Sequence, residues 1–228
     1  MEKKLSNRGF AKKFDEIAGK FDSISNPYTL ARRCREALAH VKGRCLEVGA
    51  GTGNVASYMG DKKNYILSDI SIGMCRVASK NQHASAVCCD AESLPFSPDS
   101  FDSIVSLEVV YYLNNPESFI KEARRVLREK GKLIIIMAND DMKIYDGMRK
   151  ALRKLGISNM YFDDGITSFM KLKELQKLLA KNGFKTTLSK KIVMFPLKML
   201  HNVNLIVEKT FLKNLCAFVF VVAEKTGK

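Results

Sequence analysis

Glycines stand at alternate positions in the segment Cys45-Leu46-Glu47-Val48-Gly49-Ala50-Gly51-Thr52-Gly53-Asn54, directly after a short apolar run. Glycine lacks a Cβ atom, so it adopts positive φ angles and lets a ligand lie against the backbone. The segment therefore predicts a strand, a tight glycine turn and a helix-like continuation, which is how open α/β sheets form a nucleotide-like site at the end of their first strand. The alternative is a glycine turn that binds no ligand.

The spacing of the glycines argues against two common nucleotide sites. A dinucleotide-binding turn has the pattern Gly-x-Gly-x-x-Gly and presents a helix N-terminus to a pyrophosphate. This chain instead has Glu-x-Gly-x-Gly-x-Gly from Glu47 to Gly53. The carboxylate of Glu47 would repel a pyrophosphate but suits a ligand that carries an ammonium group. No Gly-Lys-Ser/Thr follows, which excludes a phosphate-binding P-loop.

Further strand-like runs follow the glycine turn, and three of them lead into an acidic residue. The expected strands are residues 65–68, 86–89, 101–107 and 132–137, and the acids that follow the first three are Asp69, Asp90 and Glu108. Strands that alternate with helices predict a parallel, doubly wound sheet. Ligands of such sheets bind across the carboxyl ends of the strands, so these acids and Glu47 are expected along one edge.

Four groups of residues form a recognisable pattern in chain order: Leu46 to Gly53; Asp69-Ile70-Ser71 with Met74 and Ala78; Asp90 to Phe96 with Phe101-Asp102; and Glu122 to Lys132. On these residues the chain resembles the class I S-adenosylmethionine-dependent methyltransferases, of the type 11, small-molecule kind related to quinone- and biotin-pathway enzymes. The resemblance implies an α/β fold with a Rossmann-like, seven-stranded and mostly parallel sheet. Strand seven would be antiparallel, and helices would cover both faces.

The resemblance also implies S-adenosylmethionine as cofactor and S-adenosylhomocysteine as product. Glu47 would orient the amino group, Asp69 would accept hydrogen bonds from both ribose hydroxyls, and Asp90 would accept one from the adenine amine. The implied cofactor contacts are Tyr28, Glu47, Gly49, Ala50, Gly51, Gly53, Asp69, Ile70, Met74, Asp90, Ala91 and Leu107. Taken singly, Asp69 could instead cap a helix, and Met74 and Tyr28 could serve only in packing.

The fourth expected strand leads into residues that the resemblance places beside the transferred methyl group. Relatives often have a histidine near position 111 or 112, and this chain has none there. The candidates for a general base are therefore Glu108, Tyr111 and Tyr112, or else no base is needed. The fourth expected strand is not followed by an Asn/Asp-Pro-Pro-Tyr/Phe sequence. This argues against methyltransferases that act on the amino groups of adenine bases or glutamine side chains.

The length of 228 residues suits a single α/β domain, residues 1–228. We expect residues 1–42 to form an N-terminal helical lid, because Phe10, Phe14 and Phe21 recur at helical spacing. Residues 43–137 would be the cofactor-binding core. Residues 138–228 would carry substrate-side elements, the last helix and strands six and seven, with a helical insert at 194–214.

The insert at 194–214 has apolar residues at helical spacing: Leu197, Leu200, Val203, Val207 and Phe211. Such a stripe usually packs on the body of a domain, but a basic amphipathic helix can also rest on a membrane or receive a lipid-like substrate. The net charge is +14. Residues 131–228 carry 18 Lys and Arg against 8 Asp and Glu. Contact with an anionic membrane through 171–214, nucleic-acid binding and a merely solvated basic surface all remain open.

The remaining composition predicts a cytoplasmic protein. The N-terminus lacks the apolar segment of a signal peptide, no run of about 20 apolar residues exists, and the six cysteines form no disulfide or metal-binding pattern. We expect no metal site. The predicted function is methyl transfer to oxygen or carbon of a small, apolar or lipid-like acceptor. The alternatives are an RNA methyltransferase and a non-catalytic protein that binds the cofactor.

Overall fold

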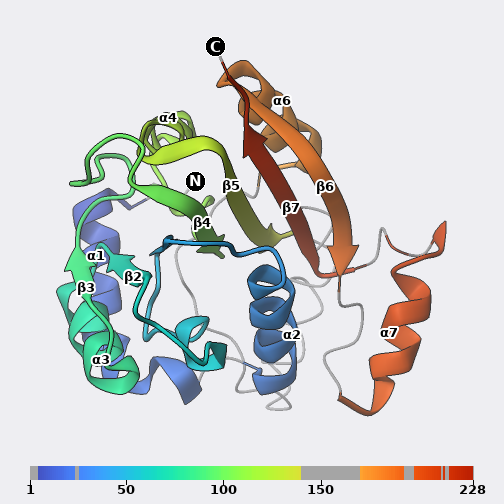
Figure 1. Ribbon diagram of the computed structural model, residues 1–228. Helices are drawn as coiled ribbons and strands as arrows, with labels where there is room; N and C mark the ends of the chain where they lie inside the picture. Colours follow the sequence, from blue (N-terminus) through green and yellow to red (C-terminus); the bar gives the residue numbers. More distant parts are fainter. Residues whose placement is uncertain are drawn as a thin grey trace.

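A single sheet runs through the computed structural model, which describes residues 5–23, 26–139, 170–192, 198–211, 213 and 216–227 (Figure 1). Its strands are β1 (Cys45–Val48), β2 (Tyr65–Asp69), β3 (Ala86–Cys88), β4 (Phe101–Leu107), β5 (Leu127–Ala138), β6 (Phe184–Ile192) and β7 (Phe218–Lys225). Their order is β3-β2-β1-β4-β5-β7-β6. Strands β1 to β5 are parallel to one another. Strand β7 lies between β5 and β6 and runs antiparallel to both. The predicted seven-stranded, mostly parallel sheet is confirmed.

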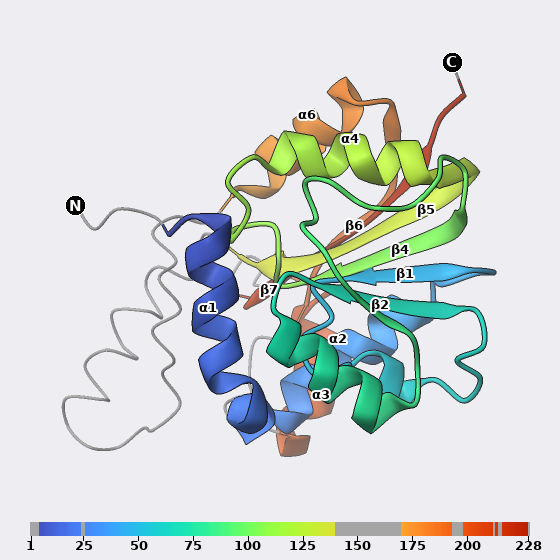
Figure 2. The ribbon, with the colours of Figure 1, turned by 90° about the vertical axis from the view of Figure 1, so that its left-hand side faces the viewer.

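Helices cover both faces of this sheet, as Figure 2 shows, with α4 and α6 on one face and α2 and α3 on the other. The α-helices are α1 (Asn7–Ile17), α2 (Pro27–Leu38), α3 (Ile72–Gln82), α4 (Pro116–Val126), α6 (Leu172–Lys181) and α7 (His201–Val207). Short 3₁₀ helices are η1 (Ala18–Ser23), η2 (Ala56–Tyr58) and η4 (Lys198–Leu200). No helix in these described parts of the chain is long and apolar enough to cross a bilayer.

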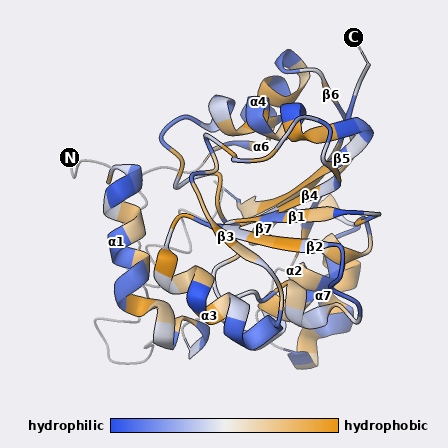
Figure 3. Ribbon diagram, turned by 60° about the vertical axis from the view of Figure 1, so that its left-hand side comes forward, coloured by the Kyte–Doolittle hydropathy of each residue, from blue (hydrophilic) through white to orange (hydrophobic). Residues whose placement is uncertain are grey.

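The side chains of β5 alternate between the two apolar cores. Leu133 and Ile135 pack into the core beneath α4 and α6, whereas Ile134 and Ile136 pack into the core on the α2 and α3 side. All four are fully buried. A strand covered on both faces must be apolar at successive positions, and Figure 3 shows the hydrophobic residues concentrated on the central strands.

The structure differs from the sequence prediction in two elements, the start of β5 and the segment after the glycine turn. Strand β5 begins at Leu127 instead of residue 132, because α4 ends at Val126 and the chain passes directly into the sheet. The predicted helix after the glycine turn is wrong, since only the three residues of η2 are helical there. The backbone becomes extended at Met59, where ψ is 138°, and this ends the helical segment after one turn.

The glycine turn requires glycine for steric reasons at its first position. Gly49 has φ 69°, a conformation that other residues adopt only with strain. A Cβ atom added there would also collide with the side chain of Val109, at the end of β4. The turn therefore fixes both the backbone direction after β1 and the close approach of the segment that follows β4.

Replacing Gly49 with alanine should destabilise the protein. We expect Gly49→Ala to lower the free energy of unfolding by ~2–4 kcal/mol, from positive-φ strain and overpacking against Val109. Urea unfolding measures the change. Gly60→Ala is the matched control, because none of the described atoms lies within 4 Å of a Cβ added at Gly60. Equal unfolding midpoints for the two variants would contradict this account of the turn.

Candidate active site

A pocket lies at the carboxyl ends of β1, β2 and β4, where the order of the sheet reverses. Strand β1 has β2 on one side and β4 on the other, so the connections that leave these strands diverge and a crevice remains. Ten of the expected cofactor contacts line it: Glu47, Gly49, Ala50, Gly51, Asp69, Ile70, Met74, Asp90, Ala91 and Leu107. The topology thus brings together residues that are up to 60 positions apart in the chain.

Asp69 holds the glycine turn against the end of β2. Its Oδ2 accepts a hydrogen bond from the Gly51 amide at 2.8 Å, and its Oδ1 accepts one from the Ser71 amide at 2.9 Å. Ser71, not Asp69, caps α3, because the Ser71 hydroxyl oxygen accepts from the Met74 amide. Loss of hydration in the pocket wall raises the pKa of the Asp69 carboxyl, and the amide hydrogen bonds oppose that shift. Each carboxylate oxygen still has acceptor capacity for a ligand hydroxyl.

Glu47 places a second carboxyl group in the wall of the pocket. It is 3% exposed, and among the described residues its buried Oε2 has no hydrogen-bond partner. Burial raises the pKa of Glu47 to about 8, and the neighbouring Asp69 adds to the shift. A buried carboxyl oxygen without a partner is costly, and an ammonium group placed there would satisfy it. The residues therefore fit the amino group of S-adenosylmethionine.

The third acid, Asp90, lies beside apolar pocket residues. Its Oδ1 accepts from the Glu92 amide at 2.9 Å, and its Oδ2 accepts from the side-chain amide of Asn7 at 2.6 Å. Met74 is 1% exposed and lines the pocket, so it is both a core residue and a wall of the site. Ile70 completes an apolar slot suited to a flat heterocycle.

The N-terminal helices close one side of the pocket and are tied down by two acids. Asp15 Oδ1 accepts hydrogen bonds from the Ser71 hydroxyl at 2.6 Å and the Gly73 amide at 2.7 Å. Asp22 Oδ1 accepts from the Thr52 hydroxyl at 2.5 Å. Figure 2 shows α1 standing at the end of the sheet. The N-terminal segment is thereby fastened both to the start of α3 and to the glycine turn.

Aromatic rings of this segment pack on the residues that follow β4. Phe10 and Phe14 both meet Tyr112 edge to face, with ring centroids 5.2 and 5.3 Å apart. Phe14 also meets Phe21 at 6.2 Å. All four rings line the pocket. They form an apolar cover that can exclude water from the site.

A charged cluster lies on the β4 side of the pocket. Glu108 has φ 60°, a strained conformation for a non-glycine residue. Its Oε2 accepts a hydrogen bond from the Tyr111 hydroxyl at 2.6 Å and lies 3.6 Å from Nη1 of Arg33. Arg33 is 8% exposed, donates to the Thr29 carbonyl and lies over the Phe218 ring at 4.3 Å. Glu108 and Arg33 line the pocket, whereas Tyr111 is buried behind them.

Two expected cofactor contacts are not among the residues that line the pocket. The Tyr28 hydroxyl instead lies 3.1 Å from Nδ1 of His201 and accepts a hydrogen bond from Asn204, because this face of α2 packs against α7. Gly53 shapes the turn: a Cβ there would lie 2.6 Å from Cγ of Gln82.

Sequence reasoning missed Asn7, Leu30 and Arg33, which line the pocket from α1 and α2. None of the three belongs to a motif, and the helical spacing that identified the phenylalanines does not single out individual residues of this kind. In the described parts of the chain, no cluster of three His, Cys, Asp or Glu side chains could hold a metal ion.

Comparison with known proteins agrees with this geometry. A methyltransferase domain family matches residues 46–135. An uncharacterized protein of Methanocaldococcus jannaschii is 33% identical over 178 residues, which are 75% of this chain and 80% of that protein. A ubiquinone/menaquinone biosynthesis C-methyltransferase of Nitrosospira multiformis is 25% identical over 74% of this chain and 84% of its own length.

A solved structure of a SAM-dependent methyltransferase from Thermotoga maritima has the same fold. It superposes with a TM-score of 0.72 at 19% identity and covers 95% of this chain and 100% of its own. The stretch that the methyltransferase family model matches, residues 46–135, includes the glycine turn and the acids Glu47, Asp69 and Asp90 of the pocket. On these grounds the chain belongs to the class I S-adenosylmethionine-dependent methyltransferases and is an enzyme that uses this cofactor.

Proposed function

We propose that this methyltransferase acts on an oxygen or carbon atom of a small, largely apolar acceptor that carries one polar group. The proposal rests on the side chains that line the β4 side of the pocket. The packed rings of Phe10, Phe14 and Tyr112 line the same pocket as the ion pair of Arg33 and Glu108. An enclosed apolar space with a few fixed polar groups is typical of a small-molecule site. The quinone-pathway names of several relatives support the same acceptor class.

The residues of β1 itself and of the strands on its β2 side would hold the cofactor. We assign the amino group to Glu47, the ribose hydroxyls to Asp69, and the adenine to the slot of Ile70 and Met74 with Asp90 at its edge. When bound, S-adenosylmethionine supplies a methyl group on a sulfonium sulfur, which is a good leaving group. Because the sheet order is β3-β2-β1-β4, Asp69 and Asp90 follow strands on the β2 side of β1, and the Glu108 cluster lies on the β4 side.

The chain contributes orientation and the exclusion of water. Holding two reactants in line can lower the activation barrier by ~7–11 kcal/mol. The rings of the N-terminal helices cover the pocket, and the hydrogen bonds of Asp15 and Asp22 keep that cover closed. Opening for acceptor entry would have to break these contacts. The N-terminal segment is accordingly assigned the role of a lid.

Glu108 is the best-placed candidate for a general base. The Tyr111 hydroxyl and the Arg33 guanidinium fix its carboxylate at the pocket wall, and a base must be held within hydrogen-bond reach of the proton it removes. Tyr111 would then be a positioning residue, because it reaches the pocket only through Glu108. Tyr112 lines the pocket directly and is the second candidate.

An RNA methyltransferase is the competing function, and the net charge of +10 over residues 131–228 favours it. The covered, largely apolar pocket favours a smaller acceptor. Incubating the enzyme and labelled cofactor with a fractionated extract decides between them. We expect label in the organic-soluble, small-molecule fraction. Label confined to RNA or protein would overturn the proposed acceptor class.

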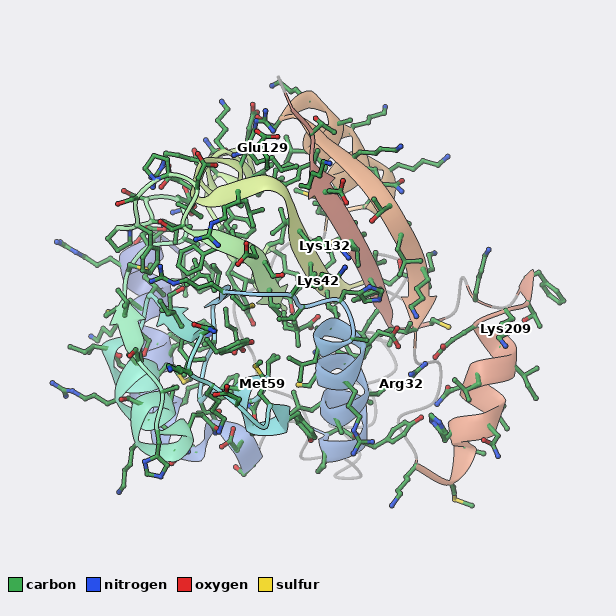
Figure 4. The ribbon with its side chains drawn as sticks, in the orientation of Figure 1. Arg32, Lys42, Met59, Glu129, Lys132 and Lys209 are labelled. Carbon is green, nitrogen blue, oxygen red and sulfur yellow. The ribbon has the colours of Figure 1, made fainter. Side chains whose placement is uncertain are left out.

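Removing the candidate base should slow transfer without weakening cofactor binding. With the acceptor fraction from that assay, Glu108→Gln should lower the rate about 10²–10⁴-fold and leave the affinity for S-adenosylhomocysteine unchanged. Glu129→Gln is the control, because Glu129 is an exposed acid away from the pocket (Figure 4). A normal rate for Glu108→Gln would show that no base is needed at this position.

Asp69 should be the strongest single determinant of cofactor affinity. Asp69→Asn replaces a charged acceptor of ribose and backbone hydrogen bonds, so S-adenosylhomocysteine should bind roughly 10- to 100-fold more weakly by calorimetry. Asp61→Asn, in an exposed loop, is the matched control. If both variants bind as tightly as the wild type, the assignment of the ribose to Asp69 is wrong.

Cofactor binding should be linked to a proton from Glu47. With a pKa of about 8, Glu47 is mostly protonated at pH 7, whereas a bound ammonium group favours its ionised form. Binding of S-adenosylhomocysteine at pH 7 should therefore release roughly one proton, and affinity should rise between pH 6 and 7. Calorimetry in buffers of different ionisation enthalpy measures this release. Glu47→Gln should abolish it, and a release that persists in this variant would refute the assignment.

A further inference from the structure

Helix α7 buries Asn204 and Val207 against the protein and exposes the apolar side chains of Val203 and Ile206 to solvent. Asn204 is fully buried and donates a hydrogen bond to the Tyr28 hydroxyl at 3.0 Å. Glu208 accepts one from Arg32 at 3.0 Å, and Figure 4 shows Arg32 between α2 and α7. Helices that only pack on a domain turn their apolar stripe inward, whereas α7 turns Val207 and two polar contacts inward and leaves other large apolar side chains in solvent.

The outer side carries large apolar side chains with high exposure. Met199 is 86% exposed, Val203 40%, Ile206 65% and Phe211 83%. The first three recur at intervals of four and three residues and therefore share one face of the helix. Together with Phe211 they are four of the six large apolar side chains that are exposed in the described parts of the chain. Such a concentration marks an interaction surface.

Cations surround these apolar side chains. Lys198, Lys209 and Lys213 are exposed, and the acid within residues 198–213, Glu208, is paired with Arg32. Figure 1 shows α7 standing at the margin of the molecule, away from the sheet. We call this surface the α7 face: the apolar residues Met199, Val203, Ile206 and Phe211 with the three lysines.

We propose that the α7 face docks on an anionic lipid bilayer. Apolar side chains on the outside of a short helix can enter the boundary between headgroups and acyl chains, while the flanking lysines attract anionic headgroups. A polynucleotide would satisfy the lysines but leave the apolar side chains in water. The bilayer is therefore the occupant that uses both halves of the surface.

The position of α7 gives such docking a use. Its inner face is bound to Tyr28 and Arg32 of α2, and the opposite side of α2 lines the pocket through Leu30 and Arg33. Docking would bring this wall of the pocket close to the bilayer, where an apolar acceptor is concentrated. Only this last step depends on the proposed function, because membrane binding itself needs no methyl transfer.

Vesicle flotation with the full chain tests the proposal. The wild type should bind vesicles of mixed phosphatidylglycerol and phosphatidylcholine more tightly than vesicles of phosphatidylcholine alone, and less tightly at high salt. Ile206→Asp should reduce binding to the mixed vesicles roughly tenfold or more, since it removes an apolar side chain and adds a negative charge. Asn81→Asp adds the same charge at an exposed position of α3, which lies on the opposite side of the molecule from α7 (Figure 1), and should retain most of the binding.

Calorimetric binding of S-adenosylhomocysteine is the second readout and should be equal in both variants, which shows that the domain is folded. Failure of the wild type to bind anionic vesicles would overturn the proposal, as would equal loss in the two variants. Binding to tRNA in place of vesicles, weakened alike by both substitutions, would also overturn it. Loss of vesicle binding with intact cofactor binding separates this proposal from the assignment of the methyltransferase site.

Discussion

The hydrogen bond from the Gly51 amide to the Asp69 carboxylate, at 2.8 Å, is the contact on which the site depends. It joins the turn after β1 to the end of β2, and through the Ser71 amide the same carboxylate sets the start of α3. The N-terminal segment is fastened to both partners, since Asp15 bonds to Ser71 and Asp22 bonds to Thr52 in the turn. The floor and the cover of the pocket are therefore positioned by one small hydrogen-bonded network.

The site also concentrates carboxyl groups in a buried wall where their ionisation is unfavourable. Burial raises the pKa of Glu47, and loss of hydration raises that of Asp69. A chain that keeps such groups in its pocket wall stores an unfavourable interaction, which a ligand with an ammonium group and hydroxyl donors relieves. The backbone of Glu108, on the β4 side of the pocket, is also held in an unfavourable state. Such backbone strain persists only where the surrounding contacts determine the geometry.

Helix α2 connects the pocket to the outer surface. Leu30 and Arg33 face the pocket, whereas Tyr28 and Arg32, one turn apart, hold α7 on the opposite side. The spacing of 3.6 residues per turn makes this division possible within twelve residues. A single helix thereby links the wall of the acceptor site to the segment with the exposed apolar face.

The order and spacing of the residues were enough to predict the sheet, the glycine turn and the acids beside it. Strands buried on both faces must be apolar at successive positions, and the ends of parallel strands meet at one edge, so Glu47, Asp69, Asp90 and Glu108 could be placed without coordinates. Only the tertiary structure decided the partners of the helices. Tyr28 turned out to bond to Asn204, 176 positions away, and Arg33 to pair with Glu108. The direction of a helical side chain follows from which distant elements pack against each face, and residue spacing within one helix carries no information about that choice.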